Sequence, residues 1–264
     1  MNETTTNESV ANQYILQSVT NALSIIDLLG EYEELSVSEV AKHMNIGKTT
    51  AFRLLATLES SGYICKYTSA KYRLSMKLAM LGTIVTKRNE IANISHPFLE
   101  DISSYFKETV HMVVWNSDSD IIVVDRVIGS SPISYHTNIG YITRPAHIAA
   151  SGQVLLAFTE EERVLRYLSQ INWEQYSGSS IPDSDSLRAL LSKVRENKMA
   201  TNDGDVIPGL YCFAIPVFGY NGHAIASLSI AGTETNLKNK REEMIARLNE
   251  CSLQIHQQIC LGLE

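Results

Sequence analysis

The fold of the first part of the chain is decided by the stretch Leu35-Ser-Val-Ser-Glu-Val-Ala-Lys-His-Met-Asn-Ile-Gly-Lys-Thr-Thr-Ala-Phe-Arg-Leu-Leu-Ala-Thr-Leu58. Ser36 and Glu39 have the spacing of a capping box, in which each side chain accepts a hydrogen bond from the other residue's backbone N–H. They predict the start of a short helix, whose apolar face is formed by Val37, Val40, Ala41 and Met44. The turn Asn45-Ile-Gly47 and a second helix from Lys48 to Ser60, closed by Gly62, complete a tight helix pair.

The residues on either side of this pair extend it into a small domain. Upstream, a helix is predicted behind Ser18 as a possible N-cap and ends at Gly30; its apolar positions are Val19, Ala22, Ile26 and Leu29. Downstream, the β-formers at 63–67 and 71–74 flank a polar turn, which is typical of a hairpin. Three helices followed by a hairpin predict a winged helix-turn-helix.

Positive charge is concentrated in this domain, although the whole chain has a formal net charge of −7. From Val40 to Leu78 there are seven basic residues, and Glu59 is the only acidic one. A phosphate backbone would select such a segment. The predicted contacts are Lys48, Thr49, Thr50, Phe52, Arg53 and Thr57 on the outer face of the second helix of the pair, with Lys71 and Arg73 on the wing.

This segment has two other interpretations. Gly47-Lys-Thr-Thr50 resembles the end of a P-loop, but the glycine required five positions earlier is Lys42, so nucleotide binding is disfavoured. A protein-binding module in which the basic helix contacts an acidic partner stays open.

The remaining sequence predicts a second, larger domain, because 264 residues exceed the usual size of one domain. The predicted boundaries are a flexible tail at 1–12, the winged helix-turn-helix at 13–75, a linker helix at 76–96 and an effector domain at 97–264. Strands at 110–115, 121–127, 210–218 and 224–230 alternate with helices at 98–107, 149–158, 160–168, 184–197 and near the C-terminus. Hairpins packed against helices predict an α+β fold with an antiparallel sheet.

The sequence also limits the location and the chemistry of the protein. No apolar run approaches a membrane span, and the first nine residues are polar and acidic, unlike a signal peptide. We therefore expect a cytoplasmic protein without disulfides. The four cysteines lack metal-binding spacing, so we expect no metal site and no cofactor.

Specific motifs resemble those of IclR-type regulators. The stretch 35–58, followed by Gly62-Tyr-Ile and Tyr72-Arg-Leu, resembles the DNA-binding domain of that family. The second half agrees through Pro145-Ala-His147, Ala150-Ser-Gly152, Leu155-Leu-Ala-Phe158, Gly209-Leu-Tyr-Cys212 and Ala214-Ile-Pro-Val217. The resemblance implies a GAF-like effector domain and a homodimer or a dimer of dimers (a homotetramer). It also implies a roughly palindromic double-stranded DNA operator and control by a small carboxylate-bearing metabolite. We expect a repressor of a catabolic operon.

The resemblance also implies an effector site. Ala150 and Ser151 would offer backbone amides to a carboxylate at a helix N-terminus. The other expected residues are Tyr135, Arg144, Asn202, Leu210, Cys212 and Ser229. The sequence departs from the family pattern at Asn202, Ala231 and Gln153, where an aspartate, a serine and a lysine are usual. Arg144 replaces an apolar residue, which predicts a larger or doubly charged ligand.

An enzyme with a helical appendage is the alternative to a regulator, with Cys212 or Ser229 as nucleophile. The sequence lacks the nucleophile elbow, the dinucleotide-binding loop and the zinc-protease helix that common enzyme classes require. Cys212 in an apolar strand is equally consistent with a core residue. His147 is better explained as a partly buried structural histidine than as a ligand contact. The sequence therefore favours a regulator and predicts no catalytic residue.

Overall fold

The computed structural model describes residues 15–67, 70–134, 137–143, 145–176, 180–204 and 208–261. The predicted tail at 1–12 and two predicted ligand contacts, Tyr135 and Arg144, lie outside these residues. The chain divides into two compact units, Met1–Thr86 and Lys87–Glu264. Within the described ranges, no helix is both long and apolar enough to cross a membrane.

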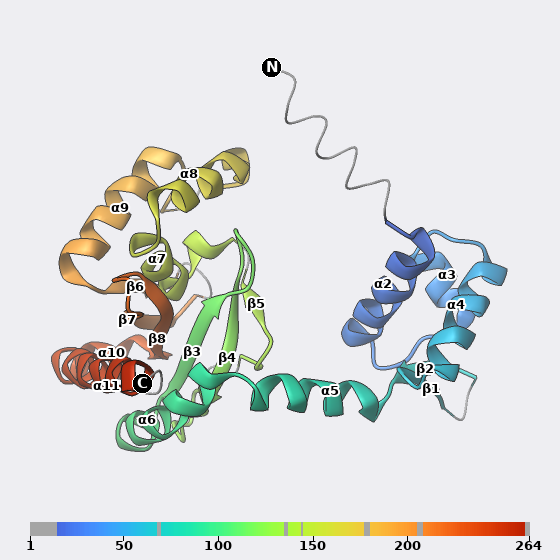
Figure 1. Ribbon diagram of the computed structural model, residues 1–264, viewed down its shortest axis with the longest axis horizontal. Coiled ribbons are helices and arrows are strands. Elements are labelled where there is room, and N and C mark those ends of the chain that lie inside the picture. Colours follow the sequence, from blue (N-terminus) through green and yellow to red (C-terminus); the bar gives the residue numbers. More distant parts are fainter. Residues whose placement is uncertain are drawn as a thin grey trace. The chain divides into compact units, whose positions relative to one another are not determined.

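Unit 1 is the predicted winged helix-turn-helix (Figure 1). Its elements are α2 (Gln17–Glu31), α3 (Val37–His43), α4 (Lys48–Ser60), β1 (Ile64–Lys66), β2 (Tyr72–Leu74) and α5 (Met76–Lys87). The capping box of α3 is formed in both directions: Glu39 N donates to Ser36 Oγ at 3.3 Å, and Ser36 N donates to Glu39 Oε2 at 2.7 Å. β1 and β2 pair antiparallel as the wing. The predicted helix pair and hairpin are confirmed.

The first helix, α2, differs in detail from the prediction. It begins at Gln17 after Leu16, so Ser18 lies inside the helix and is not its N-cap. Its buried residues are Ile25 and Leu29, whereas Val19 is 51% exposed. Ile26, predicted on the apolar face, is partly buried and packs against the core of the unit, and the neighbouring Ile25, which the prediction left out, is completely buried. Ile25 belongs to the same buried apolar cluster as Leu55 and Tyr72.

The single linker helix predicted at 76–96 is two helices, and this prediction was wrong. α5 ends at Lys87, and α6 (Glu90–Phe106) begins after Asn89, whose side chain accepts a hydrogen bond from Ala92 N at 3.0 Å. Pro97, which directly follows the predicted end of the linker helix at residue 96, lies inside α6. Proline costs a helix one backbone donor, a loss that helix packing can offset. An asparagine cap therefore outweighed a proline in setting this boundary, and the predicted domain limit at 96/97 falls within α6.

Unit 2 is an α+β layer structure built on one six-stranded antiparallel sheet, as predicted. Its strands are β3 (Thr109–Trp115), β4 (Ile121–Val127), β5 (Ile142–Thr143), β6 (Ala200–Asp203), β7 (Leu210–Phe218) and β8 (Ala224–Thr233), in the order β5-β4-β3-β8-β7-β6. Besides α6, its helices are η1 (Ala146–Ile148), α7 (Ala150–Ala157), α8 (Glu161–Gln170), η2 (Trp173–Tyr176), α9 (Ser184–Asn197), α10 (Glu234–Asn239) and α11 (Arg241–Leu261). The sequence did not reveal β5, β6, η1, η2 or α10.

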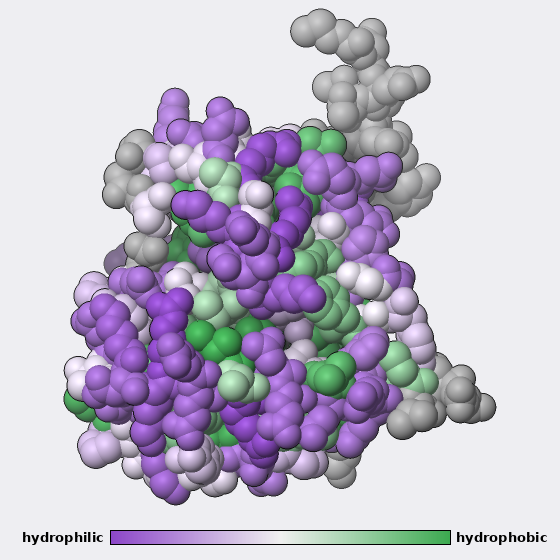
Figure 2. Space-filling view, turned by 90° about the vertical axis from the view of Figure 1, so that its left-hand side faces the viewer, coloured by the Kyte–Doolittle hydropathy of each residue, from purple (hydrophilic) through white to green (hydrophobic). Residues whose placement is uncertain are grey.

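Helices cover both faces of this sheet (Figure 1). α6 and α11 pack against one face, where Met112, Phe213 and Leu228 are buried. α7, α8 and α9 form a second apolar cluster on the other face with Val113 and Ala214. Successive side chains of a strand point to opposite faces, so β3, β7 and β8 contribute to both clusters. The side of the molecule seen in Figure 2 is mainly hydrophilic, and its apolar residues form separate groups.

Candidate functional site

The outer face of α4 presents the predicted residues to solvent. Lys48, Thr49, Thr50, Phe52, Arg53 and Thr57 are all exposed. The large apolar side chain of Phe52 is 51% exposed, although Ala51 and Leu55 beside it are buried. The exposed face of α4 thus combines basic side chains, hydroxyl groups and an aromatic ring. Such groups suit the polar base edges, the phosphates and the thymine methyl groups of a DNA major groove.

The N-terminus of α4 is electrostatically unusual. Its N-cap, Gly47, provides no side-chain hydrogen bond, and its first turn contains no acidic residue. The first helical residue is Lys48, a cation at the end of the helix where the macrodipole favours an anion. An anion such as a phosphate would relieve this repulsion and accept bonds from the first backbone N–H groups.

Two of the predicted contacts are already engaged within unit 1. Lys71 Nζ forms an ion pair with Glu34 Oε1 at 3.2 Å, so its charge is partly balanced. The Thr57 hydroxyl donates its only hydrogen to the Arg53 carbonyl at 2.8 Å, so it can only accept a bond from a partner. Arg73 is exposed on β2, with its guanidinium carbon 4.1 Å from the Tyr67 ring centre. Of Lys71 and Arg73, Arg73 is therefore better suited to contact a DNA phosphate.

A groove runs between α2 and α4. It is lined by Ser18, Val19, Ala22 and Leu23 from α2 and by Thr50, Arg53, Leu54 and Thr57 from α4. Arg53 therefore borders α2, whereas Phe52, 100° away around the helix, lies on the flank away from that groove.

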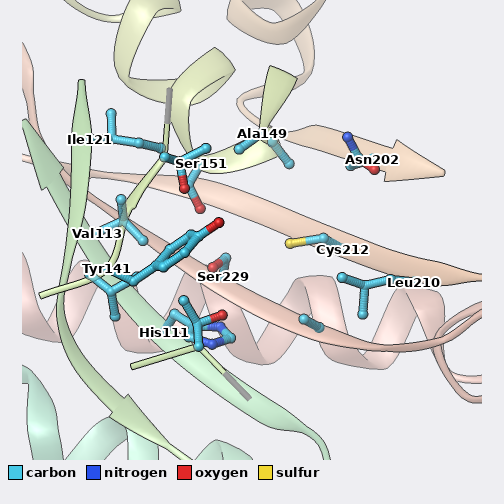
Figure 3. Close-up of a pocket in the computed structure, with 15 residues that line it drawn as sticks. His111, Val113, Ile121, Tyr141, Ala149, Ser151, Asn202, Leu210, Cys212 and Ser229 are labelled. Carbon is cyan, nitrogen blue, oxygen red and sulfur yellow. The ribbon is translucent and has the colours of Figure 1, made fainter. Parts of the chain in front are cut away.

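Unit 2 contains a cavity between the sheet and α7 (Figure 3). It is lined by His111, Val113, Ile121, Val123, Thr137, Tyr141, Thr143, Ala149, Ala150, Ser151, Asn202, Leu210, Cys212, Ser229 and Ala231. Its lining is largely apolar and includes a few polar side chains, a composition that small-molecule sites share. Six predicted residues meet here: Ala150, Ser151, Asn202, Leu210, Cys212 and Ser229.

The strand register explains why these residues meet. His111 on β3 lies directly opposite Ser229 on β8, and Cys212 on β7 lies opposite Asn202 on β6. Residues two apart on one strand share a face, so Val113 joins His111 and Leu210 joins Cys212 at the cavity. Figure 3 shows His111, Ser229 and Cys212 on the sheet below Ser151, with the Tyr141 ring extending between them.

The segment that leads into α7 is held close to the cavity. Asn202 Nδ2 donates to the Ile148 carbonyl at 2.8 Å, and Asn202 Oδ1 accepts from Gly204 N at 3.2 Å. Gly152 permits the close turn, because a Cβ there would lie 2.0 Å from the Ala146 carbonyl oxygen. Asn202 thus braces the backbone that places Ala150 and Ser151 at the helix N-terminus.

Burial keeps two titratable groups of the cavity, His111 and Cys212, neutral at pH 7. Burial, together with a smaller contribution from the positive charge of Arg126, lowers the pKa of His111 to about 4. Burial raises the pKa of the Cys212 thiol to about 12, although a hydrogen bond with Ser229 opposes the shift. A nucleophilic cysteine needs the opposite shift, so this environment does not suit Cys212 to covalent catalysis.

His147 has a structural setting, as predicted. It is buried, and Tyr167 Oη lies 2.7 Å from His147 Nδ1 and accepts a hydrogen bond from His147 N at 2.9 Å. Gln153 Nε2 donates to the His147 carbonyl at 3.0 Å. His147 does not line the cavity. Its contacts fix η1 and the start of α7.

Sequence reasoning missed several residues of the cavity. The missed residues include His111, Thr137, Tyr141 and Thr143 and the apolar wall of Val113, Ile121 and Val123. Side chains alternate along 109–115, so His111 shares a face of this strand with Val113. This alternation identifies His111 as a cavity residue only when the cavity side of the strand is known. Among the residues that the structure covers, no group of three His, Cys, Asp or Glu side chains could hold a metal ion.

Comparisons with known proteins agree with both units. Residues 18–66 match the IclR helix-turn-helix domain, and residues 83–257 match the C-terminal domain of bacterial transcriptional regulator IclR. The chain is 28% identical over 246 residues to the transcriptional regulator KdgR of Dickeya chrysanthemi, covering 92% of this chain and 80% of that protein. These relatives are regulators, not enzymes.

Solved structures give the same result. The Thermotoga maritima IclR structure matches with a TM-score of 0.75 and 27% identity, covering 92% of this chain and 98% of that one. An IclR homologue from Microbacterium hydrocarbonoxydans, complexed with 4-hydroxybenzoate, shares the fold with a TM-score of 0.76, 20% identity and coverage of 92% and 98%. With a matching DNA-binding unit and a matching effector unit over most of its length, the chain belongs to the IclR family of DNA-binding transcriptional regulators.

Proposed function

We propose that the protein represses a catabolic operon and that a small carboxylate-bearing metabolite controls it from the cavity of unit 2. We infer a carboxylate-bearing ligand from the position of the α7 N-terminus, where Ala150 and Ser151 line an otherwise largely apolar cavity. Helix N-termini favour anions. A neighbouring fold that binds 4-hydroxybenzoate, itself a small organic acid, supports the proposal.

The DNA-binding surface consists of the exposed face of α4 and the wing. Arg53 reads base edges, Phe52 and Thr49 contact the groove, and Lys48 and Thr50 bind phosphate near the helix start. Arg73 binds an adjacent phosphate. Lys71 and Thr57 take lesser parts, because Glu34 and the Arg53 carbonyl already bind them.

The proposed assembly is a homodimer, which in turn can pair as a dimer of dimers. Two helices of unit 1 carry exposed apolar side chains at four-residue spacing: Val19 and Leu23 on α2, and Met76, Met80 and Ile84 on α5. Such stripes indicate surfaces that pack against another chain. A twofold dimer would bind a roughly palindromic operator with half-sites about one helical turn apart, or a multiple of it. It would act in the cytoplasm, where the operator is.

The DNA-binding proposal is tested by electrophoretic mobility shift on DNA from upstream of the protein's own gene. Arg53→Ala should abolish sequence-specific retardation, and its melting temperature should stay near that of the wild type because the side chain is exposed. Arg166→Ala removes the same charge from an exposed position on α8 and is the matched control. Specific binding that survives Arg53→Ala would show that α4 does not read the operator.

The ligand and the direction of control are tested together. A carboxylate that occupies unit 2 raises the melting temperature, because it binds only the folded state. The same compound should release the protein from operator DNA, and loss of the protein in cells should raise transcription of the adjacent operon. Tighter DNA binding with ligand, or lower transcription without the protein, would contradict repression.

A further inference from the structure

The wing has an inner face in the core of unit 1 and an outer face directed away from that core. Ile64 on β1 and Tyr72 on β2 are buried and form the inner face. Side chains alternate along a strand, so Arg73, next to Tyr72, lies on the outer face together with Lys71. Tyr67 N donates to the Lys71 carbonyl at 2.9 Å, which extends the strand pairing by one step. Tyr67 therefore also belongs to the outer face.

Tyr67 and Arg73 are diagonal neighbours on this outer face. Aromatic and long side chains at diagonal positions of a hairpin are within reach of each other, and the guanidinium carbon of Arg73 lies 4.1 Å from the centre of the Tyr67 ring. The Tyr67 side chain is 48% exposed, and Arg73 is exposed as well. The two side chains therefore meet at the surface of the wing, where a partner molecule can reach them.

The two cations of this face are held in different ways. Lys71 is paired with Glu34, whose negative charge partly balances the charge of the lysine. The face of an aromatic ring attracts a cation through its quadrupole and adds no formal negative charge. Tyr67 can therefore restrain Arg73 without reducing the charge that Arg73 presents to a phosphate.

Restraint of Arg73 before DNA binds has a thermodynamic benefit. A long side chain that moves freely at the surface loses rotamer freedom when a partner immobilises it, and this loss lowers the affinity. The five N–H donors of a guanidinium lie in its plane. A contact through the face of the guanidinium thus leaves the donors at its edge available for charge-assisted hydrogen bonds to phosphate oxygens.

We propose that Tyr67 is a positioning residue of the DNA-binding surface, whose ring holds the Arg73 guanidinium ready for a DNA phosphate. Tyr67 acts through Arg73 and does not itself determine the affinity by contacting DNA. This inference rests on the proposed DNA-binding surface and adds to it the residue that preorganises the wing.

Three single variants of the full-length protein test the proposal, with affinity measured by fluorescence anisotropy on a labelled duplex from upstream of the protein's own gene. Tyr67→Leu removes the ring. An exposed cation–ring contact corresponds to about threefold in affinity, so a dimer that uses two wings should lose about tenfold. Tyr67→Phe keeps the ring and should bind like the wild type. Tyr32→Leu is the matched control, because Tyr32 is an exposed tyrosine of unit 1 whose ring centre lies 4.9 Å from that of His43, and it should also bind like the wild type.

A double-mutant cycle with Arg73→Ala separates positioning from other roles of Tyr67. When Arg73 is alanine, no guanidinium is left to hold, so the additional change Tyr67→Leu should alter the affinity by less than about twofold. A loss in this background as large as in the wild type would overturn the inference. It would indicate that Tyr67 contacts DNA itself or that it maintains the conformation of the wing.

The remaining outcomes separate this inference from the proposal on which it rests. If Arg73→Ala weakens binding but Tyr67→Leu does not, the inference is overturned and the DNA-binding surface stands. Equal losses in Tyr67→Phe and Tyr67→Leu would also overturn it, because the hydroxyl and not the ring would then be required. If Arg73→Ala binds like the wild type, the wing is not part of the DNA-binding surface, and the proposed role of Arg73 fails together with the inference.

Discussion

Replacing Lys48 with methionine should change stability and DNA binding in opposite directions. Lys48 is the first residue of α4, behind an N-cap without a side-chain bond and before a first turn without an acid. A positive charge at a helix N-terminus opposes the macrodipole by about 0.3–1 kcal/mol. Methionine keeps the side-chain length and a similar helix propensity. The free energy of unfolding of unit 1 should therefore rise by that amount.

The same change should weaken DNA binding in a salt-dependent way. Each phosphate neutralised contributes about 0.9 to the slope of log affinity against log salt. In a dimer Lys48 would account for two phosphates, so the slope should become shallower by about 1.8 in Lys48→Met. Between 50 and 200 mM salt, the wild type should then lose about tenfold more affinity than the variant.

Fluorescence anisotropy with labelled promoter DNA at several salt concentrations measures the slope, and urea denaturation measures the stability. Lys193→Met, at an exposed position of α9, is the matched control and should leave the slope unchanged. An unchanged slope in Lys48→Met would remove Lys48 from the DNA surface. A loss of stability would refute the argument that its charge is unfavourable in the free protein.

Three further predictions concern the fold. Ser36→Ala removes the capping box of α3 and should lower the free energy of unfolding of unit 1 by about 1 kcal/mol, measured by urea denaturation; an unchanged midpoint would contradict it. Gly152→Ala should destabilise unit 2 by about 1–3 kcal/mol, because the new Cβ would clash with the backbone of Ala146. Gly30→Ala, with open space around its Cβ, should instead stabilise unit 1 by about 0.5–1 kcal/mol. Thermal denaturation should therefore give a lower melting temperature for Gly152→Ala and a higher one for Gly30→Ala. Burial lowers the pKa of His147 to about 4, so between about pH 4 and 6.5 the unfolded chain binds more protons than the folded one. The stability that neutral His147 provides is therefore complete above about pH 6.5 and is lost as the pH falls toward 4. His147→Gln should make the free energy of unfolding less dependent on pH in this window, and an equal dependence in wild type and variant would exclude His147 as the cause.

Local signals in the sequence were sufficient for much of unit 1. The capping box at Ser36 and Glu39 and the glycine at 62 each depend on a few neighbouring residues, and the structure has the same helix limits for α4. Where two local signals competed, the prediction failed. The Asn89 cap starts a new helix before the predicted end of the linker at residue 96, although Pro97 follows that end. Ile25 is completely buried and Ile26 only partly, because the tertiary core decides between adjacent apolar residues.

The cavity was only partly predictable, for a different reason. Ala150, Ser151 and Cys212 could be placed through family motifs. His111 could not, because it meets Ser229 only through the pairing of β3 with β8, which are more than 100 residues apart in the chain. β6, which carries Asn202, is four residues long and too short for a periodic pattern. Contacts that depend on strand order are not visible in a single sequence.

The alternation of side chains along β3, β7 and β8 has a consequence for how the protein can evolve. Met112, Phe213 and Leu228 hold one face together, while His111, Cys212 and Ser229, each adjacent to one of them in the chain, face the ligand space. A substitution in the second group therefore alters the lining of the cavity and leaves the apolar cluster on the opposite face in place. Duplicated genes of this kind can therefore diverge toward new metabolites by single codon changes while retaining the same scaffold.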